Sequence, residues 1–140
     1  MTASTGGSRS LPLILARELA SNLATPIFLL DEVGNLVYYN DAAERLIGRS
    51  FSELGEIPSE EFGEALRLRD SEGVRIRRRD SPSGIAFFER RATHRVLTAT
   101  GYDGVERAVE VTAVPLFGKG EEMHGVVTVF WPSSTESGSG

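Results

Sequence analysis

The segment from Pro26 to Gly48 constrains the fold of this chain more than any other part of its sequence. It opens with an uninterrupted apolar run, residues 27–30, and reaches a second hydrophobic run through Gly34 and Asn35. Both of these residues tolerate positive φ angles, so they allow two strands to close into a hairpin. The segment therefore predicts two paired strands.

A short helix is expected directly after the hairpin. Asn40 or Asp41 can accept hydrogen bonds from the first free N–H groups of this helix, and Glu44 is spaced to answer Asp41 in a capping box. Gly48 stands where a left-handed C-cap is favoured. The predicted order is hairpin, capped helix and glycine stop.

This order resembles the opening of a PAS domain, whose residues follow the pattern D-x-x-G-x-x-x-x-x-N-x-A-A-x-x-L-x-G. The matching positions in this chain are Asp31, Gly34, Asn40, Ala42, Ala43, Leu46 and Gly48. Two later patterns are also similar to the family: D-x-P-x-x-x-A at the start of the long helix, and T-x-x-P-L before a glycine in the closing strands. The residues on these patterns are Asp80, Pro82 and Ala86, then Thr112, Pro115, Leu116 and Gly125. The resemblance covers residues 23–131 and implies sensing and signalling rather than catalysis.

The last third of the chain is rich in Val and Thr and alternates in polarity, as strands do. Strands are expected over residues 96–100, 105–117 and 123–131, and short helices over 50–54, 59–66 and 81–88. With the first hairpin this gives an α+β domain. The resemblance implies a PAS-like five-stranded antiparallel sheet with short helices on one face and an N-terminal amphipathic helix on the other.

The N-terminal helix is expected over residues 11–23, with Ser10 as its N-cap. Its apolar residues sweep about 200° of the helical wheel, whereas packing on one surface needs a stripe of only about 100°. Two interpretations stay open: the helix packs deeply on its own sheet, or it is shared with a second subunit. The second interpretation predicts a homodimer with Leu11, Leu15 and Leu19 in the interface.

Composition sets the limits of the folded part. Residues 1–9 and 132–140 are small and polar and are expected to be disordered, which leaves the helix at 10–24 and a PAS-like domain at 25–131.

No apolar run approaches the roughly 20 residues of a membrane helix, and the N-terminus lacks the order of a signal peptide, so a cytoplasmic location without membrane contact is expected. The polar tail favours a fragment of a longer sensor with an output domain or signalling partner; a free-standing module is the alternative.

The chain contains no cysteine. PAS domains of the light-oxygen-voltage type need one beside the flavin, and those of the photoactive yellow protein type need one for a thioester, so neither chemistry is expected. Haem needs an axial ligand, but His94 lies in an arginine-rich turn and His124 opens a strand, so both are interpreted as exposed. A structural zinc site is not expected either. No haem or other cofactor is predicted, while flavin binding without photochemistry and an unknown small molecule stay open.

Arg75, Arg77, Arg78 and Arg79 form the densest positive run. The preferred interpretation is a solvated segment balanced by neighbouring carboxylates. The alternative is a clamp for an anionic ligand at the mouth of a pocket, because guanidinium groups bind such ligands bidentately. The formal net charge of -5 and the lack of interleaved aromatic residues argue against a nucleic-acid partner.

Apolar residues on the helices and the last strand are candidates for lining an internal pocket. These candidates are Leu46, Phe62, Leu66, Ile85, Phe88 and Val127. They either fill the core or leave a cavity for a small ligand. The sequence shows no catalytic triad, no phosphate-binding glycine loop and no carboxylate pair at a forced spacing.

The sequence and the resemblance together favour a non-enzymatic regulatory sensor or interaction module in signal transduction, which homodimerises and binds a small ligand in an internal cavity. A ligand-free dimerisation scaffold of a larger signalling protein is the alternative, and a small cone-shaped, isomerase-like enzyme is a third hypothesis. A cavity would favour the sensor over the scaffold. A buried carboxylate or histidine inside that cavity would favour the enzyme.

Overall fold

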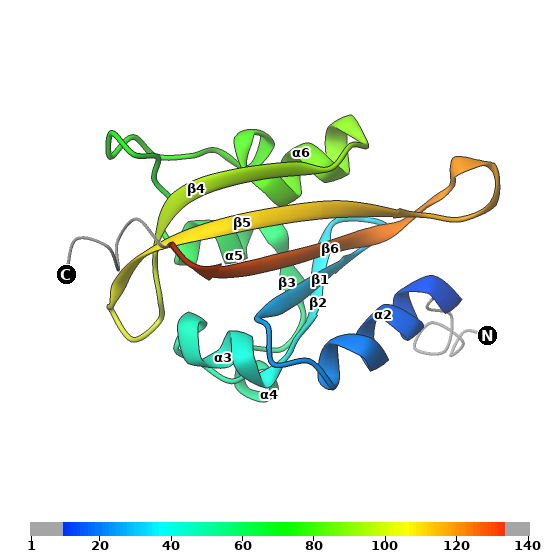
Figure 1. The fold of residues 1–140 in the computed structure, drawn as a ribbon, viewed down its shortest axis with the longest axis horizontal. Helices are drawn as coiled ribbons and strands as arrows, with labels where there is room; N and C mark the ends of the chain where they lie inside the picture. The colour runs from blue at the N-terminus through cyan, green and yellow to red at the C-terminus, as the bar shows by residue number, and fades with distance from the viewer. Residues whose placement is uncertain (1–9, 134–140) are drawn as a thin grey trace.

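A six-stranded antiparallel sheet organises the chain, and the computed structural model describes residues 10–133 (Figure 1). The strands are β1 (Ile27–Asp31), β2 (Asn35–Tyr39), β3 (Ile57–Pro58), β4 (Thr93–Thr100), β5 (Glu106–Phe117) and β6 (Met123–Pro132). Their order across the sheet is β3-β2-β1-β6-β5-β4. The expected α+β fold is therefore confirmed with one strand more than the five predicted, because the two-residue β3 pairs with β2 at the edge.

Short helices fill the middle of the chain, and one helix precedes the sheet. They are α2 (Leu11–Ser21), α3 (Asp41–Ile47), α4 (Phe51–Leu54), α5 (Ser59–Ala65) and α6 (Pro82–Glu89), with 3-10 turns η1 (Arg78–Asp80) and η2 (Lys119–Glu121). Ser10 caps α2 and Ser81 caps α6, each through its hydroxyl. None of the helices between residues 10 and 133 is long and apolar enough to cross a membrane.

The β1–β2 hairpin closes through its turn residues. Gly34 has a φ of 91°, a conformation that favours glycine. Asp31 Oδ1 accepts hydrogen bonds from Val33 N at 3.0 Å and from Asn35 N at 2.9 Å. The aspartate thus fixes the turn from inside, as aspartates commonly do in such turns.

The cap of α3 settles which of two neighbouring residues starts this helix. Asn40 is the N-cap, and its Oδ1 accepts from Ala43 N at 3.0 Å. The predicted capping box between Asp41 and Glu44 is wrong, because Glu44 Oε2 instead accepts from Phe51 N at 3.0 Å and joins α3 to α4. Gly48 ends the helix in the left-handed conformation, as expected.

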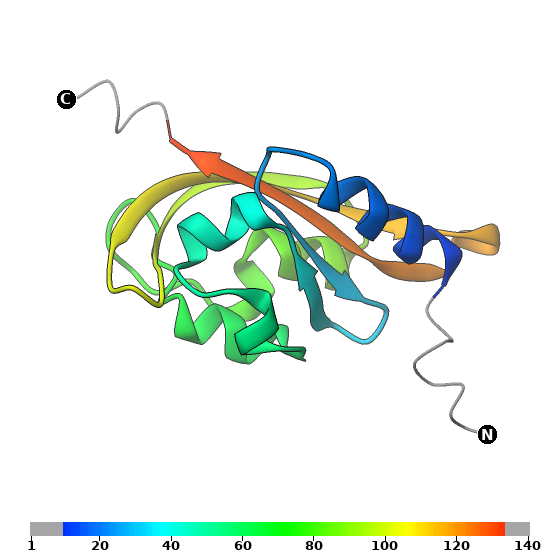
Figure 2. The same cartoon turned by 90° about the horizontal axis from the view of Figure 1, so that it is seen from below.

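The sheet separates two hydrophobic clusters, with α2 on one side and the short helices on the other (Figure 2). Alternate residues of a strand point to opposite faces. On β6, Val126 and Phe130 therefore belong to the cluster under the short helices, whereas Val127 and Val129 pack against the cluster under α2. The buried members of the α2 cluster are Leu13, Ala20, Ile27, Leu29 and Val37.

Two expected boundaries differ from the structure. Helix α2 ends at Ser21, two residues before the predicted end. Strand β6 runs through Pro132, and the buried Ser133 donates its N–H to Ala108 O at 2.9 Å, so the predicted disordered tail cannot begin at residue 132. The disorder expected for residues 1–9 and for the rest of the tail lies outside the described residues.

Candidate functional site

A cavity of about 1040 Å³ lies between the sheet and the short helices. Pockets that hold small molecules typically measure roughly 300–1,000 Å³. The volume of this cavity, in a chain of 140 residues, is at the upper end of that range. Part of its sheet wall comes from alternate positions of β4 and β5, where Leu97 pairs with Val109 and Ala99 with Arg107, and where Val111 follows Val109 on the same face. The same alternation places the intervening residues on the outer face of the sheet.

Three aromatic rings line the cavity, two from the sheet and one from a helix: Phe28 on β1, Phe130 on β6 and Phe62 on α5. The rings of Phe28 and Phe62 lie 5.4 Å apart edge to face, and those of Phe28 and Phe130 lie 5.9 Å apart. Such offset arrangements are the favourable ones for aromatic pairs. The rings thus join an apolar sheet wall to an apolar side chain of α5.

Four of the six residues predicted to line a pocket do so: Leu46, Phe62, Leu66 and Phe88. Ile85 is half-buried on α6 and is not part of the lining. The placement of Val127 in the pocket is wrong, because Val127 faces α2 on the other side of the sheet. Its neighbour Val126 occupies the helix-side core instead.

The cavity reaches solvent along residues 74–80, which we call the rim segment. Val74 is 58% exposed and yet belongs to the lining, and the arginines at 75, 77, 78 and 79 line the cavity with it. The preferred interpretation of this arginine-rich run was a solvated segment, whereas its position at the cavity is the one that the alternative, a clamp at the mouth of a pocket, requires. The run is brought there by Arg69, whose backbone pairs with Thr98 on the edge strand β4.

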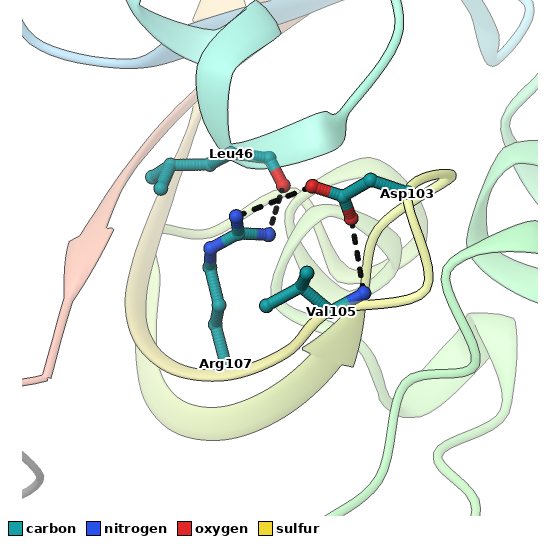
Figure 3. Close-up of polar contacts among 4 residues, drawn as sticks. All are labelled: Leu46, Asp103, Val105 and Arg107. Atoms are coloured by element: carbon teal, nitrogen blue, oxygen red, sulfur yellow. Dashed lines mark hydrogen bonds and ion pairs between the residues drawn. The ribbon is translucent and has the colours of Figure 1, made fainter.

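Polar contacts, which we call the latch, join Asp103, Val105 and Arg107 to Leu46 (Figure 3). Leu46 and Arg107 also line the cavity. Arg107 Nη1 donates to Leu46 O at 3.0 Å, and Arg107 Nη2 contacts Asp103 Oδ2 at 3.3 Å. Asp103 Oδ1 accepts from Val105 N at 3.0 Å, and this hydrogen bond, helped by Arg107, holds the pKa of the Asp103 carboxyl below its usual value. The latch joins the β4–β5 turn to the end of α3, where a cation is favoured by the helix dipole.

Tyr39 supports the same corner of the structure. Its hydroxyl donates to Arg49 O at 2.7 Å, and its ring lies 5.2 Å from that of Phe51. Burial raises the pKa of Tyr39, so the phenol stays protonated and keeps donating. The residue is therefore a structural support for α3 and α4.

Neither histidine lies in the cavity lining. His94 is on the outer face of the sheet, where its Nδ1 lies 2.7 Å from Thr112 Oγ1 and its Nε2 lies 3.3 Å from Glu110 Oε1. His124 lies beside Glu122, with 3.6 Å between Nε2 and Oε1. Within residues 10–133, no three His, Cys, Asp or Glu side chains gather as metal ligands would.

The outer side of α2 is apolar and exposed. Leu11, Leu15 and Leu19 are 64%, 58% and 62% exposed, whereas Leu13 is buried against the sheet. Residues four apart lie on one side of a helix, so the three exposed leucines form a single stripe. Ile14, which the sequence analysis did not single out, is also exposed beside them.

Comparison with known proteins agrees with this architecture. The family described as PAS fold matches residues 15–131. Among solved structures, the PAS domain of BvgS from Bordetella pertussis is 16% identical with a TM-score of 0.60, and 91% of each chain is covered. The PAS domain from the fruit-fly ELK potassium channel is 12% identical with a TM-score of 0.66, covering 86% of this chain and 95% of that one.

A third structure, the LOV protein of Rhodobacter sphaeroides, is 13% identical with a TM-score of 0.68, covering 88% of this chain and 68% of that one. Curated protein sequences provide no match. At these identities the solved structures establish the fold alone, and the family match over most of the chain establishes membership. The chain belongs to the PAS family, whose members are signalling sensor modules.

Proposed function

We propose that this chain is a non-enzymatic regulatory sensor that binds a small molecule in the cavity and works as a homodimer. The single observation that carries the proposal is the cavity of about 1040 Å³ in the core, which a ligand-free scaffold would not need. Apolar walls of Leu97, Val111 and Phe130 suit the body of a small organic ligand. A cytoplasmic setting and an output domain or signalling partner are part of the same proposal.

The charged groups of the lining favour binding over acid–base catalysis. Its three carboxylates, Glu60, Glu64 and Asp80, are all exposed. A general acid or base is usually tuned by burial and by fixed neighbours. The isomerase-like hypothesis would need such a group inside the cavity, and the described lining offers none.

A titration followed by two-dimensional ¹H–¹⁵N NMR tests ligand binding. The probe is octan-1-ol, a neutral molecule whose binding depends on apolar walls alone. We expect saturable shifts at cavity amides such as those of Phe62, Leu97 and Val111, with the amides of Leu15 and Ala16 in α2, on the other side of the sheet, unaffected. Shifts absent from the cavity amides, or equal in α2, would overturn the proposed binding.

The exposed stripe of α2 supports the homodimer. Full burial of a leucine contributes roughly 1.5–3 kcal/mol, and about 60% of each of Leu11, Leu15 and Leu19 is still available to a partner. Covering them would thus contribute several kcal/mol per subunit, enough for association at micromolar concentration after the cost of association. The same stripe would serve the alternative function, a ligand-free dimerisation scaffold.

Sedimentation of two variants tests the dimer. Leu15→Glu and Leu19→Glu would each place an unpaired charge in the interface, so we expect folded monomers. Ser21→Glu is the matched control, because it adds the same charge at an exposed polar position at the end of α2. A wild type that is monomeric at about 100 μM, well above the expected dissociation constant, would show that α2 packs only on its own domain.

A further inference from the structure

We propose that the cavity selects amphiphilic anions, molecules with an apolar body and a single carboxylate or phosphate head that the rim segment holds. The inference rests on the proposed ligand-binding function and adds the chemical class of the ligand. Its carriers are Arg77, Arg78 and Arg79, at the point where the apolar interior meets solvent.

The interior of the cavity can recognise only an apolar body. Its buried lining side chains are all apolar except that of Ser81. The Ser81 hydroxyl is already used, since it donates to Arg78 O at 2.8 Å and accepts from Gly84 N at 3.0 Å. A polar group placed deep inside would lose its hydrogen bonds to water without replacement, which is costly. The head group of a ligand therefore belongs at the rim.

The rim carries positive charge that is not neutralised locally. Five arginines and three carboxylates line the cavity, an excess of two positive charges in a chain whose formal net charge is -5. Two of these arginines are engaged, Arg75 with Glu64 at 3.1 Å and Arg107 with Asp103 at 3.3 Å. No carboxylate between residues 10 and 133 forms an ion pair with any of the other three.

Two guanidinium groups of the rim, those of Arg78 and Arg79, lie over aromatic rings. Arg78 Cζ lies 5.0 Å from the centroid of Phe88 and 5.8 Å from that of Phe87, and Arg79 Cζ lies 4.9 Å from that of Phe88. A Cβ on Gly34 would lie 2.7 Å from Arg78 Nη2, so this guanidinium also lies against the β1–β2 turn. Contacts of this kind leave the N–H groups in the plane of the guanidinium free to bind an oxyanion bidentately.

The positive charge of the rim segment lies beside the entrance to the apolar cavity. Phe88 is 38% exposed and lines the cavity, so the same ring contacts two arginines and the ligand space. An anion with an apolar body can satisfy both surfaces at once. A small hydrophilic anion would contact the arginines but not the apolar walls of the cavity. A neutral apolar molecule would contact the walls but not the arginines.

Calorimetric titration with three matched probes tests the inference: octanoate, octyl phosphate and octan-1-ol. We expect at least one anion to bind about tenfold more tightly than the alcohol, the lower end of what hydrogen bonds to charged groups contribute, because the rim is exposed. Higher salt should weaken the binding of the anion but not that of the alcohol. The better-bound anion identifies the preferred head group.

Two triple variants assign the effect to the rim. In Arg77→Gln/Arg78→Gln/Arg79→Gln, the anion and the alcohol should bind within about threefold of each other. The control, Arg17→Gln/Arg45→Gln/Arg91→Gln, removes as many arginines away from the cavity and should retain the preference. Equal affinities in the wild type, or a preference that survives loss of Arg77, Arg78 and Arg79, would overturn this inference and leave the proposed function standing. Binding of none of the probes would overturn both.

Discussion

Replacing the single side chain of Asn40 should destabilise the protein strongly. Asn40 is 1% exposed, and its amide group connects three parts of the structure. Oδ1 accepts from Ala43 N at 3.0 Å, as the cap of α3, and from Ile27 N at 3.2 Å, at the start of β1. Nδ2 donates to Ala20 O and to Thr25 O, both at 2.9 Å, at the end of α2 and in the segment after it.

The expected loss follows from these contacts. Removal of an N-cap side chain costs about 1 kcal/mol. Asn40→Ala also leaves the buried Ile27 N unpaired, at about 1–3 kcal/mol. Ala20 O keeps its hydrogen bond from Leu23 N at 3.1 Å, and the exposed Thr25 can be hydrated. Because such terms are not additive, we expect about 2–3 kcal/mol in total.

Urea unfolding monitored by the fluorescence of Trp131, the only tryptophan, measures the effect at a fixed protein concentration. Asp41→Ala is the matched control. Asp41 is exposed and only adds its charge to the first turn of the helix, so its loss should cost well under about 1 kcal/mol. Asn40→Asp keeps the cap oxygen but puts a buried carboxylate oxygen against Ala20 O and Thr25 O, so it should destabilise the protein by more than the loss of the two bonds alone. A loss under about 1 kcal/mol for Asn40→Ala, or equal losses for Asn40→Ala and Asp41→Ala, would show that Asn40 does not hold these elements together.

Three further predictions concern other parts of the molecule. Thr128→Val should raise the free energy of unfolding by about 1 kcal/mol, because the Thr128 hydroxyl is buried without a hydrogen-bond partner among the described residues; a lower urea midpoint would contradict this. Asp103→Asn should be less stable than the wild type at neutral pH. The folded-state pKa of Asp103 lies below the usual 3.8. The wild type should therefore have the higher free energy of unfolding above that value, and the difference should shrink as the pH falls through the folded-state pKa. A difference in unfolding free energy that stays constant from neutral to acidic pH would be inconsistent with the latch. The purified protein should be colourless, since neither histidine lies at the cavity, and a stoichiometric Soret or flavin band would contradict that expectation.

The parts of the fold that the sequence predicted are those governed by neighbours in the chain. The β1–β2 hairpin, the start of α3 near Asn40 and its end at Gly48 follow from turn and cap chemistry within a few residues. The Val- and Thr-rich strands were also found, with β4 starting at Thr93 rather than at residue 96. Local rules suffice for such elements.

The parts that were missed depend on contacts between distant residues. Whether Val126 or Val127 faces the short helices is a matter of sheet register, which shifts all side chains of a strand together. The partner of Glu44 is Phe51 rather than its own helix start, because α4 folds back onto α3. The rim segment carries no periodic signal, and its place across the cavity follows from the pairing of Arg69 with Thr98.

Native mass spectrometry of freshly purified protein tests at once whether this sensor is a dimer and whether it holds a ligand in its core. This measurement reports the number of subunits and any retained small molecule together. We expect a dimer that carries a small organic molecule, released when the protein is denatured, and retained less well in Arg77→Gln/Arg78→Gln/Arg79→Gln. A dimer of bare chains would contradict the ligand-binding function and favour the scaffold, and a bare monomer would contradict the whole proposal.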